Sequence, residues 1–136
     1  VKAIVLQQAT ISYESVIRNH KFKDKLLEAY GLPPGCDDDL AISSLQFNDP
    51  VNRTRILVEQ RGQGLASLLP NVLFIHGDQD ENMLYKENPV RLGEVLSPSG
   101  AKYAFHTFQG VGHATYALGD IAAEVLVNFF KREYQL

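Results

Sequence analysis

The chain has 136 residues, of which 45% are hydrophobic and 21% are charged, and its formal net charge is −3. This composition is too apolar for a disordered chain, and the length fits one domain with a modest core. The 13 basic residues are balanced by 16 acidic ones, so the sequence indicates no basic surface for nucleic acid. A single cysteine excludes an internal disulfide framework, and no apolar run approaches the roughly 20 residues that span a bilayer.

The first predicted elements are a strand and a series of short helices. The apolar run over residues 2–7 is typical of a buried parallel strand. Acidic residues at first turns, and glycine or proline beyond last turns, predict helices over residues 23–30, from 37 onward and over 50–59. In the last of these, Asp49 is the expected N-cap and Pro50 the expected first residue.

From residue 69 onward the pattern is a regular alternation of strands and helices. The run 72–75 predicts a buried strand, and residues 102–108 alternate in the manner of a second strand. A helix is expected over 89–96, and a C-terminal one on an apolar stripe of Ile121, Ala122, Val125, Leu126, Phe129 and Phe130. Strands that alternate with helices imply βαβ units, so the predicted fold class is α/β with a mostly parallel sheet of about three strands.

Two loops that directly follow strands carry the chemistry. The first contains Asp80 and the second contains His113. In open α/β sheets the functional crevice lies beyond the carboxyl ends of the strands, and an acid followed by a histidine is the order that ends a hydrolase triad there. The carboxylate would hold the imidazole Nδ1–H, while Gly110 and Gly112 would let the second loop turn sharply.

Residues 69–136 resemble the C-terminal third of the α/β-hydrolase superfamily, especially its esterase, thioesterase and prolyl-oligopeptidase-like branches. The family's His-Gly-x-x-Asp pattern after a strand reads His76-Gly-Asp-Gln-Asp80 here, and its Gly-x-x-His loop reads Gly110-Val-Gly-His113. The resemblance implies that Asp80 is the catalytic acid and His113 the general base, with no cofactor and no metal.

The same resemblance implies a single partial hydrolase domain over residues 1–136. Residues 1–10 would hold the strand that follows the nucleophile helix, and residues 11–68 would form a helical lid or cap. Residues 69–136 would hold the acid- and histidine-bearing strands and helices.

The nucleophile of this family is missing from the sequence. Its elbow requires Gly-x-Ser-x-Gly at a strand-to-helix turn, and no serine of the chain is flanked in this way. The oxyanion-hole motif, which precedes the nucleophile, is missing as well. The sequence is therefore interpreted as the C-terminal half of a serine hydrolase that cleaves a carboxylic ester, thioester or amide of a small-molecule or acyl substrate.

On this interpretation the chain is inactive by itself, and an N-terminal half in the same or a separate chain completes the enzyme. The alternative is a non-catalytic module, a truncated or degenerate hydrolase that binds a partner through its exposed sheet edge.

Simpler interpretations apply to other residues near the two loops. Asp78 is an alternative acid, although a role in ordering the turn is favoured. His76 is interpreted as a structural residue at the end of the strand. A metal site of these two residues with Asp80 would match no standard ligand spacing. Cys36 is interpreted as a packing thiol rather than a nucleophile.

Overall fold

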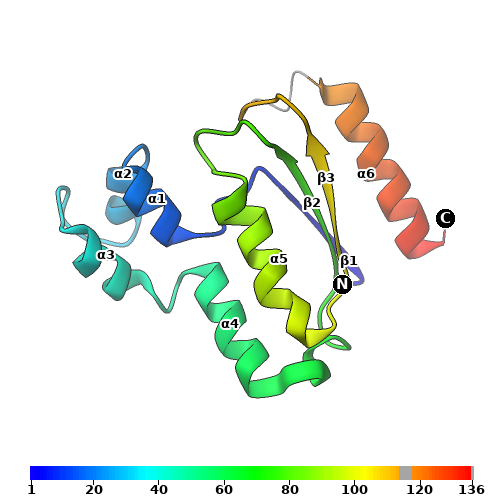
Figure 1. Ribbon diagram of the computed structural model, residues 1–136, viewed down its shortest axis with the longest axis horizontal. Coiled ribbons are helices and arrows are strands. Elements are labelled where there is room, and N and C mark those ends of the chain that lie inside the picture. Colours follow the sequence, from blue (N-terminus) through cyan, green and yellow to red (C-terminus); the bar gives the residue numbers. More distant parts are fainter. Residues whose placement is uncertain (114–117, 136) are drawn as a thin grey trace.

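A computed structural model describes residues 1–113 and 118–135 of the chain (Figure 1). Three strands form one parallel sheet in the order β1 (Ala3–Gln7), β2 (Asn71–Gly77) and β3 (Tyr103–Phe108). The predicted α/β fold with a parallel sheet is therefore confirmed. Because the strands are parallel, the loops that follow β2 and β3 leave the sheet at the same end.

Helices make up most of the rest of the described chain. They are α1 (Tyr13–Asn19), α2 (Lys23–Ala29), α3 (Asp38–Leu45), α4 (Pro50–Arg61), α5 (Arg91–Leu96) and α6 (Gly119–Tyr134), with 3₁₀ turns at Gly62–Leu65 and Ser97–Ser99 and a π turn at Lys86–Val90. None of the helices described is both long enough and apolar enough to cross a membrane.

The predicted starts of the short helices are confirmed. Asp37 accepts hydrogen bonds at the start of α3, and Asp49 caps α4 with Pro50 in its first turn. Helix α1 was not predicted, although Ser12 caps it by accepting a hydrogen bond from the N–H of Ser15 at 3.1 Å. A serine ahead of a short apolar run was the signal that could have revealed it.

Helices cover both faces of the sheet (Figure 1). Successive side chains of a strand point to opposite faces, so Val72 and Phe74 of β2 pack with α4 and α5. Leu73 and Ile75 pack against Phe129 of α6 on the other face. The sheet is thus the middle layer of an α/β/α arrangement.

Two local predictions differ from the structure. Ile121 is 52% exposed, because it lies at the edge of the α6 stripe whose centre is formed by the buried Ala122 and Phe129. The helix expected from residue 89 is preceded by a π turn that contains Pro89. Proline has no N–H to donate, and the N–H of the next residue bonds to the carbonyl of Tyr85 at 3.3 Å instead.

Helices α1 to α3 have a small core of their own and are called the cap below. Ile17, Leu27 and Ala41 are completely buried in this core, and Leu45 and Cys36 complete it. Cys36 is therefore a packing thiol, as predicted. Helix α4 instead packs against α5 and contributes Val51 to the core beside the sheet, so residues 11–68 contain the cap and one helix of the main body.

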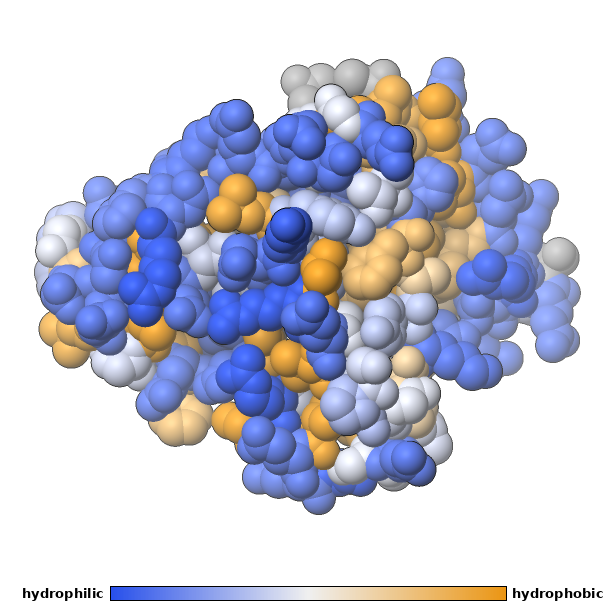
Figure 2. Space-filling view, viewed as in Figure 1, coloured by the Kyte–Doolittle hydropathy of each residue, from blue (hydrophilic) through white to orange (hydrophobic). Residues whose placement is uncertain are grey.

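The outer strands β1 and β3 each pair only with β2 within the described chain. Hydrophobic side chains reach the surface between α5 and α6, where β3 lies (Figure 2). Phe105 of β3 is a large hydrophobic side chain that is 39% exposed. The sheet is therefore covered by helices on its faces but open along its edges.

Candidate active site

Asp80 lies in the turn after β2, and its side chain is completely buried. Oδ1 accepts hydrogen bonds from the backbone N–H groups of Asn82 and Met83, both at 2.8 Å. Oδ2 lies 2.9 Å from Nδ1 of His113, which follows β3. The structure thus brings together the two predicted site residues, which are 33 positions apart in the sequence.

His76 is a second histidine beside the same carboxylate. Its side chain is buried, with Nε2 2.6 Å from the carbonyl oxygen of Met83 and 3.2 Å from Oδ2 of Asp80. Burial lowers the pKa of His76, against the opposing effects of these two neighbours, so the ring is neutral near pH 7. Both neighbours are acceptors, which places the ring proton on Nε2. His76 therefore holds the acid in place as well as ending the strand.

Gln8 was missed by the sequence reasoning. Its backbone N–H extends the β1–β2 ladder by donating to Ile75, and its side-chain Nε2 donates to the carbonyl of Gly112 at 2.9 Å. The same Nε2 lies 3.4 Å from Oδ2 of Asp80. The side-chain amide of Gln8 therefore contacts both Asp80 and the loop that holds Gly112 and His113 (the histidine loop). Its backbone has φ +44°, in the left-handed region that non-glycine residues rarely adopt. A polar residue directly after a strand, at the same end of the sheet as the two loops, was the available signal.

The acid loop and the histidine loop pack backbone to backbone at Gly77. A Cβ there would lie 2.1 Å from the carbonyl oxygen of Val111, so a side chain has no room. Asp78 accepts a hydrogen bond from the N–H of Gly110 at 2.7 Å, which orders the turn as expected. Gly110 has a left-handed φ of +72°, which favours glycine, whereas Gly112 has no positive φ.

His113 borders an open pocket of about 720 Å³, called the cap pocket below. The pocket is lined by α1 and α2 of the cap, by Thr10 and Tyr30 beside them, by Met83 of the acid loop and by His113. The His113 side chain is 43% exposed, and no hydrogen bond to its Nε2 is found among the described residues. The volume of the cap pocket suits a small organic ligand.

These contacts define what the pair can do chemically. An ionised Asp80 accepts the proton of His113 Nδ1, which leaves the lone pair of a neutral imidazole on Nε2. That nitrogen can take a proton from a hydroxyl, and the buried carboxylate stabilises the imidazolium that forms. The described residues contain no group of three His, Cys, Asp or Glu side chains arranged to hold a metal ion.

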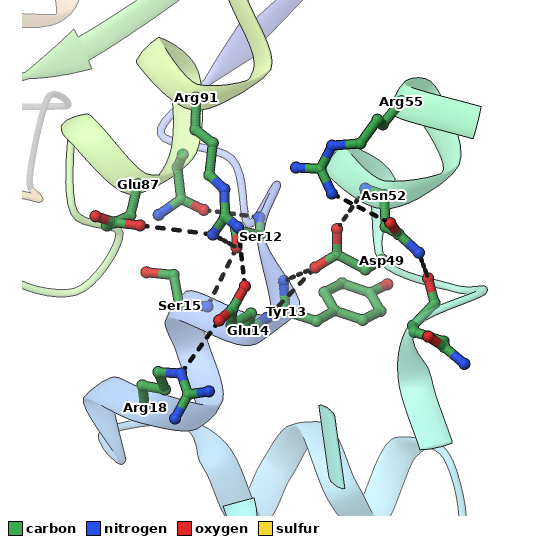
Figure 3. Close-up of polar contacts among 12 residues, drawn as sticks. Ser12, Tyr13, Glu14, Ser15, Arg18, Asp49, Asn52, Arg55, Glu87 and Arg91 are labelled. Carbon is green, nitrogen blue, oxygen red and sulfur yellow. Dashed lines mark hydrogen bonds and ion pairs between the residues drawn. The ribbon is translucent and has the colours of Figure 1, made fainter. Parts of the chain in front are cut away.

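The cap wall of the pocket is anchored to the main body by a polar network (Figure 3). Asp49 of the α4 start accepts the N–H of Tyr13 at 2.6 Å, and Arg91 of α5 pairs with Glu14 at 2.9 Å. The hydrogen bond from Arg91 is the main reason why the pKa of Glu14 is lowered. The buried amide of Asn88 accepts two further N–H groups just ahead of α1. These contacts fix the helix that forms one wall of the cap pocket.

Comparison with known proteins supports the fold. No protein-family model matches the chain, and no curated protein matches it. An acylaminoacyl peptidase from Pyrococcus horikoshii matches 97% of the chain with a TM-score of 0.70 and 14% identity. A puromycin-hydrolyzing peptidase of Mycobacterium tuberculosis matches 83% with a TM-score of 0.59 and 18% identity. Acetyl xylan esterase 1 from Thermoanaerobacterium sp. JW/SL YS485 matches 91% with a TM-score of 0.53 and 16% identity.

The chain therefore has the fold of part of an α/β-hydrolase, as the sequence resemblance predicted. It spans 20% of the first peptidase, 15% of the second and 37% of the esterase. At these identities the likeness concerns the fold, and the chemistry has to be argued from the site itself.

Proposed function

We propose that the chain supplies the acid and the general base of a serine hydrolase that cleaves a carboxylic ester, thioester or amide. In this proposal His113 takes the proton of a serine as it attacks the carbonyl and then returns a proton to the leaving group. Asp80 holds His113 in the required tautomer. The serine belongs to a part of the enzyme outside these 136 residues, in the same polypeptide or a separate one.

One observation carries the proposal. The contact between the buried Oδ2 of Asp80 and Nδ1 of His113, at 2.9 Å, leaves Nε2 as the basic atom of a half-exposed ring that borders a pocket. A histidine that merely stabilises a loop needs neither a buried carboxylate partner nor a pocket beside its second nitrogen. The fold shared with known hydrolases is a further support.

The test uses the chain purified through an affinity tag from its native host, together with any polypeptide fused or bound to it. This preparation is expected to react with a fluorophosphonate probe and to hydrolyse p-nitrophenyl acetate. Asp80→Asn and His113→Ala should each lower kcat by about a thousandfold or more, because each removes a member of a unit that acts together. Far-ultraviolet circular dichroism checks that the variants are folded.

Two controls sharpen the assignment. Asp78→Asn should lose less than about tenfold, because an amide oxygen can still accept the N–H of Gly110. His20→Ala removes an exposed histidine whose Nε2 lies 3.3 Å from Oδ2 of Asp38, and it should leave turnover unchanged. A larger loss for Asp78→Asn than for Asp80→Asn would reassign the acid. Labelling of a serine within these 136 residues would show that the nucleophile lies inside the chain, and a lack of both labelling and turnover would favour the non-catalytic module.

A further inference from the structure

The described residues that line the cap pocket include a positively charged side chain and no negatively charged one. Lys25 of α2 is the one lysine or arginine among the described residues that line it, and no aspartate or glutamate of the described chain contributes to its wall. The Nζ atom of Lys25 lies 5.8 Å from the centre of the Phe22 ring, which also borders the pocket. The rest of the wall consists largely of aliphatic and aromatic side chains. A ligand in this pocket therefore meets an apolar surface with a single ammonium group.

The acidic residues of α2 do not neutralise this ammonium group. Asp24 and Glu28 line a different pocket, together with the turn at residues 31–34. Lys23, the other lysine of the helix, is engaged by Asp38 at 2.6 Å. Lys25 forms no ion pair with any residue that the structure describes, in contrast to Lys23. Its charge is therefore available to a ligand.

Two tyrosine hydroxyls add a hydrogen-bond donor to the same pocket. The hydroxyl oxygens of Tyr13 and Tyr30 lie 2.8 Å apart, and both residues belong to the pocket wall. Only one of the two protons can lie between the oxygens, so the other hydroxyl can donate elsewhere. The hydrogen bond with Tyr30 raises the pKa of Tyr13 to about 12, which keeps its hydroxyl protonated near neutral pH.

We propose that the cap pocket selects substrates whose apolar part carries a carboxylate, and that Lys25 pairs with this carboxylate while the tyrosine pair donates a hydrogen bond. The inference rests on the function proposed above and narrows it to half-esters, thioesters or amides of dicarboxylic acids and similar anionic compounds. A carboxylate fits because it offers two acceptor oxygens, one for the ammonium group and one for a hydroxyl. His113 lies in the wall of the same pocket, so a ligand bound there can have its scissile carbonyl group beside the proposed general base.

The test measures binding, so that it does not depend on turnover. The probes are 7-oxooctanoate and the uncharged 7-oxooctanamide, with 5-oxohexanoate, 9-oxodecanoate and their amides to vary the length. Their ketone occupies the place of the ester and is not hydrolysed. Dissociation constants are measured by isothermal titration calorimetry on the preparation described above. We expect at least one acid to bind about three- to fivefold more tightly than the amide of equal length, the range of an exposed ion pair.

Variants assign this preference to Lys25. Lys25→Gln should abolish the preference for the acid, and Lys25→Glu should reverse it, without loss of helix content. The matched control is Lys21→Glu, which makes the same charge change at an exposed position that does not line the pocket. Equal binding of acid and amide would overturn the proposal, as would failure of both to bind. An equal effect of Lys21→Glu would do so as well, since it would reveal general electrostatics rather than a site.

The two proposals can fail separately. If Asp80→Asn leaves turnover unchanged while the preference for the acid depends on Lys25, the catalytic assignment is wrong and the pocket assignment stands. If turnover depends on Asp80 and His113 but acid and amide bind alike, the reverse holds.

Discussion

At the residue scale, the Asp80 carboxylate shows how a buried charge is accommodated. Burial of an unpaired carboxylate would cost several kcal/mol, and here backbone N–H groups bond one oxygen while polar side chains approach the other. His76 is one of these side chains, and its neutral ring is itself buried. The acid is thus held from both sides by groups of the main body.

The stability of the protein should depend on pH through His76. Burial lowers its pKa below the ordinary value of 6.5, so below that pH the unfolded chain binds a proton that the folded protein does not. The free energy of unfolding is therefore expected to fall as the pH drops below about 6.5 toward the depressed pKa, by at most about 1.4 kcal/mol per pH unit. Urea denaturation between pH 5 and pH 8 measures this.

His76→Gln serves as the comparison, because glutamine can still donate to the carbonyl of Met83 but does not titrate. The part of the pH dependence between pH 5 and 6.5 that His76 causes should vanish in this variant. An unchanged slope would mean that other groups produce it.

At the element scale, the Asp49 carboxylate bonds to the starts of two helices, one in the cap and one in the main body. Oδ2 of Asp49 accepts the N–H groups of Tyr13 and Glu14 at the start of α1, and Oδ1 accepts the N–H of Asn52 in α4 (Figure 3). Asp49 itself is buried. One residue therefore satisfies the free N–H groups of two helices that enter and leave the cap region.

Asp49→Ala should destabilise the protein by about 2–3 kcal/mol, because it leaves partly buried N–H groups of two helices unpaired. The matched control is Asp37→Ala, which removes the exposed N-cap residue of one helix, α3, and should cost about 1 kcal/mol. Urea denaturation of both variants checks the difference. Equal losses would show that Asp49 acts as the cap of a single helix.

Local signals explain which elements could be predicted. The α4 start was predictable because an aspartate followed by proline suits the N-cap and first position of a helix, a preference that acts within a few residues. Helix α1 has only seven residues, too few for a clear apolar period, and its position depends on contacts with Asp49 and Asn88. These contacts join residues 36 to 77 positions apart, which no local pattern encodes.

At the scale of the whole molecule, the open edge of β1 is the most consequential feature. The carbonyl of Lys2 and the N–H of Gln8 bond to β2. Because the backbone polar groups of successive residues in a strand point to alternate sides, even-numbered residues of β1 face β2, and the N–H of Val5 faces the outer edge. No strand of the described chain pairs there. In the proposed enzyme this edge would receive a strand of the nucleophile-bearing part, and without one it can pair with another copy.

The chain by itself is therefore expected to associate as its concentration rises. Val5→Pro should weaken this association while leaving a folded protein, since proline removes an N–H that β2 does not use. Leu6→Pro is the matched control: it removes an N–H that faces β2 and should destabilise the fold. Sedimentation velocity and urea denaturation measure the two effects. Undiminished association of Val5→Pro would show that the chains meet elsewhere.

Local sequence patterns were enough to predict the parallel sheet, the helices other than α1 and the two loops that hold Asp80 and His113. These follow from apolar runs, caps and motifs, which act over a few residues at a time. Three features became visible only in the folded chain: Gln8 lies beside the acid, His76 contacts the same carboxylate, and Lys25 borders the same pocket as His113. Local patterns could not reveal these contacts, because Gln8 meets the two loops across 72 and 104 positions of the chain. Such contacts arise only when the packed layers bring the strand ends and the cap together.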